Sequence, residues 1–152
     1  MNQTTIINKL NDLKYDGFKS AYLRQIEDTN YSKLSFDERV YNLLEAQEIF
    51  LQNKRISVNL RLSKIKDKQA SLEDIDYSSK RKIDKSIIKD LSNMNFIRNH
   101  HNVIISGCTG TGKSYLSQAL GNRAVIDGFR VYYIRMPTLL EEIKISRATG
   151  TY

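Results

Sequence analysis

The chain has 152 residues, of which 40% are hydrophobic and 27% are charged, a composition typical of folded globular domains and not of disordered chains. Its net charge of +7 and isoelectric point near 9.5 indicate a polyanionic partner. The sequence has no apolar run of the roughly 18 residues that a membrane-spanning helix needs, no signal-peptide pattern at its start, and a single cysteine, which excludes an intramolecular disulfide. We therefore expect a cytoplasmic protein with no membrane partner.

Glycine usage divides the chain into two regions. No glycine occurs between Gly17 and Gly107, and the only proline is Pro137. A stretch without these breakers favours long helices, whereas the frequent glycines after Gly107 suit alternating strands, tight loops and helices. We predict a helical N-terminal region over residues 1–95 and part of an α/β domain over residues 96–152.

Helical spacing and capping signals place the elements of the first region. Apolar residues four or five apart predict a helix over residues 13–28. Ser35 and Glu38 have the spacing of a capping box, so a helix should begin there. Its apolar stripe continues to about Lys68, as one long helix or two stacked helices. Residues 71–74 suit either a helix start or a turn.

The second region alternates between strand and helix patterns. Residues 103–106 form a short apolar, β-branched run that predicts a buried parallel strand, and residues 131–134 predict a second one. A helix is predicted over residues 113–127, with Gly128 as its C-terminal cap. Residues 138–141 have the pattern of another capping box. The order strand, helix, strand, helix predicts an α/β fold with a parallel sheet.

The loop between the first predicted strand and its helix matches the full Walker A pattern. Glycines there allow successive N–H groups to converge on a phosphate, and the helix N-terminus adds its positive dipole end. The lysine is expected to contact the β- and γ-phosphates of a nucleoside triphosphate, and the last hydroxyl to bind Mg²⁺. The loop residues are Gly107, Cys108, Thr109, Gly110, Thr111, Gly112, Lys113 and Ser114.

Two runs of basic residues are candidates for sequence-independent contacts with double-stranded DNA. A solvated helix face is the alternative interpretation of the same pattern. The first run has one acidic residue, Asp67, beside six basic residues: Lys54, Arg55, Arg61, Lys64, Lys66 and Lys68. The second run has Asp84 and Asp90 beside five basic residues: Lys80, Arg81, Lys82, Lys85 and Lys89.

Taken together, these segments make the chain similar to a known family. It resembles the IstB-like ATP-binding proteins, which are AAA+ helper ATPases of insertion-sequence transposition and relatives of the DnaC-type helicase loaders. The Walker segment is common to P-loop proteins in general. The helical N-terminal region and the sequence Ala-Leu-Gly at residues 119–121 narrow the resemblance to this family. The segments that carry it are residues 10–23, 38–61, 103–116, 119–121 with Ala124, 128–133 and 139–140.

The resemblance implies a P-loop NTPase fold of AAA+ type, with a parallel sheet that is incomplete in this chain. It also implies ATP and Mg²⁺ as cofactors, and DNA, a transposase or replicative helicase, and further copies of the chain as partners. In relatives the segment before the Walker loop can lie near the adenine, which points to Phe96 or Ile97. Glu141 and Glu142 are interpreted as solvated helix surface.

Walker B acids, sensor residues and an arginine finger are not found up to Tyr152. We therefore expect a C-terminally truncated member of the family, in which residues 1–152 bind nucleotide weakly and hydrolyse it poorly. Two alternatives stay open beside the transposition helper. One is a fragment of a helicase loader, and the other is a non-enzymatic DNA- or protein-binding remnant.

Overall fold

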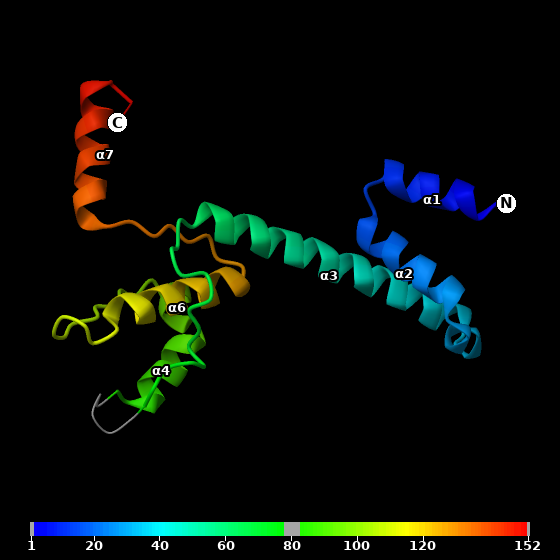
Figure 1. Cartoon of the computed structure of the whole chain (residues 1–152), viewed down its shortest axis with the longest axis horizontal. Helices are drawn as coiled ribbons and strands as arrows, with labels where there is room; N and C mark the ends of the chain where they lie inside the picture. The colour runs from blue at the N-terminus through cyan, green and yellow to red at the C-terminus, as the bar shows by residue number, and fades with distance from the viewer. Residues whose placement is uncertain (1, 78–82, 152) are drawn as a thin grey trace. The chain divides into compact units, whose positions relative to one another are not determined.

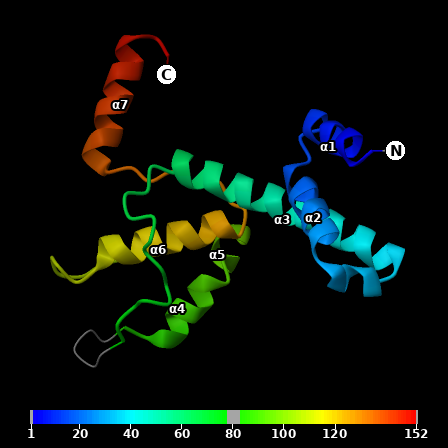
Figure 2. The same cartoon turned by 45° about the vertical axis from the view of Figure 1, so that its right-hand side comes forward.

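A computed structural model describes residues 2–77 and 83–151 (Figure 1). The regular elements within these residues are helices, and Figure 2 shows the short α5 beside its neighbours in the chain. None of them has both the length and the apolar character needed to cross a membrane. In chain order they are α1 (Gln3–Asp12), α2 (Asp16–Glu27), the 3-10 helix η1 (Thr29–Lys33), α3 (Phe36–Leu62), α4 (Lys85–Ser92), α5 (Asn95–Arg98), α6 (Lys113–Ile126) and α7 (Met136–Ala148).

The structure contradicts the predicted α/β fold. The predicted strands, residues 103–106 and 131–134, are irregular, and the described part of the chain contains helices and loops but no β-strand. The prediction of a parallel sheet, as expected of an AAA+ P-loop NTPase, is therefore wrong for the described residues. Most of the described residues before position 96 lie in helices, in keeping with the glycine-poor composition of that region.

The two apolar runs do not pair as strands, and one residue of each packs against the hydrophobic cluster. Ile105 and Val131 lie against the hydrophobic cluster that includes α6, whereas Ile104 is 91% exposed. The backbone N–H of Tyr133 donates to the carbonyl of Ser63 at 2.7 Å, in the loop after α3. A strand requires a ladder of hydrogen bonds to a neighbouring strand. Apolar, β-branched composition indicates a preference for burial but supplies no pairing partner, and Val103, Ile104 and Tyr132 are exposed in this structure.

The chain forms two compact units, Met1–Ser57 and Val58–Tyr152. This boundary follows compactness, whereas the division predicted from composition lies between residues 95 and 96 and stays a prediction. The first unit contains α1, α2, η1 and most of α3. The second contains the remaining elements and the Walker segment.

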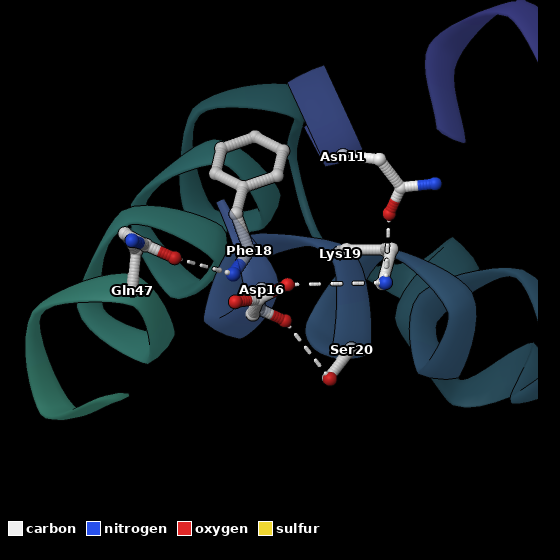
Figure 3. Close-up of polar contacts among 6 residues, drawn as sticks. All are labelled: Asn11, Asp16, Phe18, Lys19, Ser20 and Gln47. Atoms are coloured by element: carbon white, nitrogen blue, oxygen red, sulfur yellow. Dashed lines mark hydrogen bonds and ion pairs between the residues drawn. The ribbon is translucent and has the colours of Figure 1, made fainter. Parts of the chain in front are cut away.

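In the first unit, α2 crosses α3 at very short range. A Cβ atom added to Gly17 would lie 2.5 Å from Cβ of Phe50 and 2.6 Å from the carbonyl oxygen of Ala46. The amide oxygen of Gln47 accepts a hydrogen bond from the backbone N–H of Phe18 at 3.0 Å (Figure 3). This bond satisfies an N–H of the first turn of α2, which has no partner within its own helix. Only glycine permits so close an approach.

Polar contacts join α1 to α2 on the exposed side of this unit. The ammonium of Lys19 donates to the side-chain oxygen of Asn11 at 2.8 Å and lies 3.9 Å from a carboxylate oxygen of Asp16 (Figure 3). Residues 13–15 separate the two helices. The helix predicted over residues 13–28 corresponds to α2, which begins three residues later than predicted. The helix before it, α1, was not predicted from the spacing of apolar residues.

The capping box predicted before α3 is confirmed. The backbone N–H of Ser35 donates to the carboxylate of Glu38 at 2.7 Å, and the N–H of Glu38 donates to Oγ of Ser35 at 3.3 Å. The first of these bonds lowers the pKa of Glu38 from its usual value. The helix ends at Leu62 and not near Lys68. The hydroxyl of Ser63 donates a hydrogen bond to the carbonyl of Leu60 and accepts one from the N–H of Ile65, and these bonds replace those of a further helical turn.

The second unit has its core around α6. This helix buries Ala119, Leu120, Ala124 and Val125, and Met94 is fully buried in the same unit. At its C-terminus Gly128 adopts φ +91°, and the N–H groups of residues 128 and 129 donate to the carbonyls of residues 125 and 124. These are the two bonds of a Schellman motif, so the predicted cap at Gly128 is confirmed.

Candidate functional site

The Walker segment forms a loop that leads directly into α6. Gly110 and Gly112 adopt φ +81° and +90°, and Gly112 is the N-cap residue of α6. An added Cβ atom would meet no other atom within 4 Å at either position. The glycines are therefore required by backbone conformation and not by packing, since residues with side chains rarely adopt these angles. The loop therefore ends at the N-terminus of α6, whose first N–H groups lack partners within the helix.

The lysine of the motif folds back onto the loop. Its ammonium donates to the carbonyl oxygens of Gly107 at 2.8 Å and of Cys108 at 2.6 Å. The hydroxyl of Thr111 donates to the same carbonyl of Cys108 at 2.9 Å. Lys113 is thus positioned within the loop by neutral acceptors. Phosphate oxygens would be stronger acceptors for this charge than the two carbonyls.

A cavity of about 590 Å³ lies beside the loop. Five of the eight Walker residues line it: Gly107, Gly110, Thr111, Gly112 and Lys113. Cys108, Thr109 and Ser114 do not line it, although Ser114 is exposed in the first turn of α6. The volume lies within the range of small-molecule sites.

Part of the lining of this cavity was not predicted from the sequence. It includes Asp74, Ile75 and Asp76, and Tyr115 on α6. The predicted helix start or turn at residues 71–74 is a turn, in which the hydroxyl of Ser71 accepts from the N–H of Glu73. No pattern in the sequence predicts that this turn lies close to the Walker loop. Phe96 and Ile97 pack against the hydrophobic cluster and do not line this cavity, and their place near an adenine stays a prediction.

The first basic run is divided between the two compact units. Lys54 and Arg55 belong to the first unit, whereas Arg61, Lys64, Lys66 and Lys68 belong to the second. Of the second run, Lys85 and Lys89 lie on α4, and residues 80–82 lie outside the described residues. Contact of these side chains with DNA stays a prediction.

Lys64 has local partners in the structure. Its ammonium donates to the hydroxyl of Tyr132, lies 4.7 Å from the centroid of that ring, and is 3.7 Å from a carboxylate oxygen of Glu142. The bond to Tyr132, followed by the charge of Glu142, raises the pKa of Lys64. Glu141 and Glu142 are both exposed on α7, as expected of solvated helix surface. Lys66 and Lys68 are exposed in the loop after α3 and are better placed than Lys64 for an external anion.

Comparison with known proteins places these features in a family. Residues 8–152 match the family described as IstB-like ATP binding protein. The chain is 34% identical over its whole length to a Pseudomonas fluorescens protein named as an ATP-binding protein of insertion sequence IS1162, and covers 65% of that protein. It is 35% identical over 145 residues to an insertion-sequence ATP-binding protein of Sinorhizobium fredii, covering 95% of this chain and 58% of the relative. The chain thus spans about three-fifths of the length of these relatives.

Proposed function

Because the chain belongs to the IstB-like ATP-binding protein family, we propose that it binds ATP through residues 107–114 and serves as a helper in the transposition of an insertion sequence. The observation that carries the proposal is the cavity beside the Walker loop. It combines a lysine ammonium with two glycines at positive φ directly before the N-terminus of α6. Backbone N–H groups, a helix dipole and a cation at one point are suited to a polyphosphate.

Mg²⁺ is proposed to bind with the nucleotide. The described residues contain no group of three or more His, Cys, Asp or Glu side chains that could hold a metal ion. This fits Mg²⁺, which commonly retains water molecules and is held by substrate phosphates together with one or two protein oxygens. The exposed hydroxyl of Ser114 would supply such an oxygen, and the ion would neutralise charge on the phosphates.

Calorimetric titration of the purified chain with MgATP tests nucleotide binding. We expect binding with one site per chain, because one Walker loop is present. Titration with adenosine serves as the control and should give far weaker binding, since adenosine cannot engage the phosphate loop. Equal affinity for adenosine and ATP, or no heat with ATP from a folded sample, would contradict the proposal.

The names of the relatives favour transposition over helicase loading, since each is assigned to an insertion sequence. A transposase is therefore the proposed protein partner, and further copies of the chain are proposed to assemble with it. The helicase-loader function and the non-enzymatic remnant remain the alternatives. A transposase that is retained by the immobilised chain only when ATP is present would support the first proposal.

DNA binding is proposed for the second unit. Residues 1–57 contain eight basic and eight acidic residues, whereas residues 58–152 contain sixteen and nine, so the entire net charge of +7 lies in the second unit. A neutral unit gains little from the release of counterions, which drives sequence-independent DNA binding. The proposed contacts are therefore made by the exposed cations of the second unit, among them Lys66 and Lys68.

The double variant Lys66→Glu, Lys68→Glu should weaken binding to a random-sequence DNA duplex. If both ammonium groups contact phosphates, the slope of log K against log salt should become shallower by about 1.8, at roughly 0.9 for each lost contact. Fluorescence anisotropy at several salt concentrations measures it. The variant Lys14→Glu, Lys33→Glu is the matched control, because it makes the same charge change at exposed positions of the neutral unit. An equal loss of slope in both variants would show a general charge effect and contradict a local DNA interface.

A further inference from the structure

A row of polar side chains on α6 holds the segment of residues 66–71, which we call the strap. The side-chain oxygen of Gln118 accepts from the N–H groups of Lys66 and Asp67 at 3.1 and 2.9 Å. The side-chain amide of Asn122 donates to the carbonyls of Asp67 and Ala70 at 3.0 and 2.8 Å. Gln118 and Asn122 are both buried, so these bonds are largely shielded from water.

Tyr115 makes the last contact of this row, at the end of the strap nearest the cavity. Its hydroxyl accepts from the N–H of Ser71 and donates to the carbonyl of Ser71, both at 3.2 Å. Residues 115, 118 and 122 are three and four positions apart and therefore share one face of α6. Tyr115 is the only one of these three that also lines the cavity beside the Walker loop.

The turn that follows the strap brings two carboxylates into the cavity wall. Asp74 and Asp76 line the same cavity as Lys113 of the Walker loop. Negative charge would repel the phosphates of a nucleotide from residues 74–76, whereas the loop attracts them. These two parts of the lining therefore suit different parts of one ligand. The Walker loop suits the polyphosphate, and the wall with Ile75 and its neighbouring carboxylates suits an uncharged nucleoside with hydroxyl donors.

We propose that Tyr115 is a positioning residue for the nucleoside part of the ligand. By holding both backbone polar groups of Ser71, it sets the position of residues 74–76 relative to the phosphate loop. This inference rests on the proposed binding of ATP and adds that affinity for the nucleoside depends on a residue outside the Walker motif. Tyr115 acts through the strap, while the loop alone binds the phosphates.

The test compares ATP with inorganic tripolyphosphate, each with Mg²⁺, in calorimetric titrations of the chain and of Tyr115→Phe. The substitution removes only the hydroxyl and keeps the ring that packs against the core cluster. We expect affinity for ATP to fall about tenfold, the effect of losing one or two hydrogen bonds that fix the wall, and affinity for tripolyphosphate to change less than twofold. Tyr132→Phe is the matched control, since its hydroxyl bonds Lys64 and its ring does not line the cavity.

The outcomes separate this inference from the proposed function. If neither ATP nor tripolyphosphate binds the unmodified chain, the proposed nucleotide site itself fails. If the unmodified chain binds both ligands and Tyr115→Phe loses affinity for both equally, or for neither, the positioning role of Tyr115 is overturned. Equal losses of ATP affinity in Tyr115→Phe and Tyr132→Phe would also overturn it. A selective loss of ATP affinity in Tyr115→Phe alone supports it.

Discussion

Replacing Lys113 with alanine is expected to lower the affinity of the chain for MgATP by about 100-fold or more. The ammonium is the one charged group of the Walker loop, and in the structure it is already held within that loop by the carbonyls of Gly107 and Cys108. Binding of ATP would exchange these acceptors for phosphate oxygens. A hydrogen bond to a charged partner contributes about 1.5 to 3 kcal/mol, and 1.4 kcal/mol corresponds to a tenfold change in affinity.

Calorimetry measures this loss, and far-UV circular dichroism checks that α6 is retained. Lys144→Ala is the matched control, because Lys144 is exposed on α7 and its loss changes the net charge equally. That variant should bind ATP within about twofold of the unmodified chain, since distant surface charges are largely screened. Unchanged ATP affinity in folded Lys113→Ala would mean that the nucleotide binds elsewhere.

The variant Gly17→Ala is expected to destabilise the first unit by about 1 to 2 kcal/mol, the upper part of the overpacking cost less the helix-propensity gain. Alanine is favoured over glycine within a helix by about 1 kcal/mol, so composition alone predicts stabilisation. The added methyl group, however, would lie 2.5 Å from Cβ of Phe50 and 2.6 Å from the backbone oxygen of Ala46. Two helices would have to separate to relieve this overlap, and overpacking of this kind costs about 1 to 3 kcal/mol or more.

Hydrogen exchange measured by mass spectrometry locates the effect. Amides of α2 and of α3 up to residue 57 should exchange about 5- to 30-fold faster, while amides of α6 keep their rates. Ser20→Ala on the exposed side of α2 is the control and should change stability by less than about 0.5 kcal/mol, although it removes a hydroxyl bond to the carbonyl of Asp16. Protection equal to that of the unmodified chain would show that α2 and α3 do not pack as closely as the structure has them.

Most signals confined to a few neighbouring residues predicted the local structure, with one exception at the start of α7. The capping box of Ser35 and Glu38 and the cap at Gly128 are confirmed, because all the partners lie within one helical turn of each other. The helix predicted over residues 113–127 corresponds to α6 within one residue. The capping box predicted at Thr138 is wrong, since α7 begins at Met136 and Pro137 already occupies its first turn.

Contacts between residues far apart in the chain could not be predicted from such local sequence patterns. The two predicted strands are wrong because neither run has a neighbouring strand among the described residues, and a run of apolar residues does not specify its partner. The bonds between Tyr115 and Ser71 join residues 44 positions apart. A single tyrosine after a Walker motif has no pattern that would identify such a partner.

The sequence by itself determined the family, the Walker motif directly before a helix, and the helix caps at Ser35 and Gly128. Each of these depends on residue types at short, fixed spacing, for which backbone geometry leaves few alternatives. Only the tertiary structure decided that the two apolar runs do not pair as strands, that Lys64 is held by Tyr132 and Glu142, and that residues 74–76 line the same cavity as the Walker loop. These depend on packing between distant segments, where many pairings satisfy the same pattern of hydrophobicity and charge.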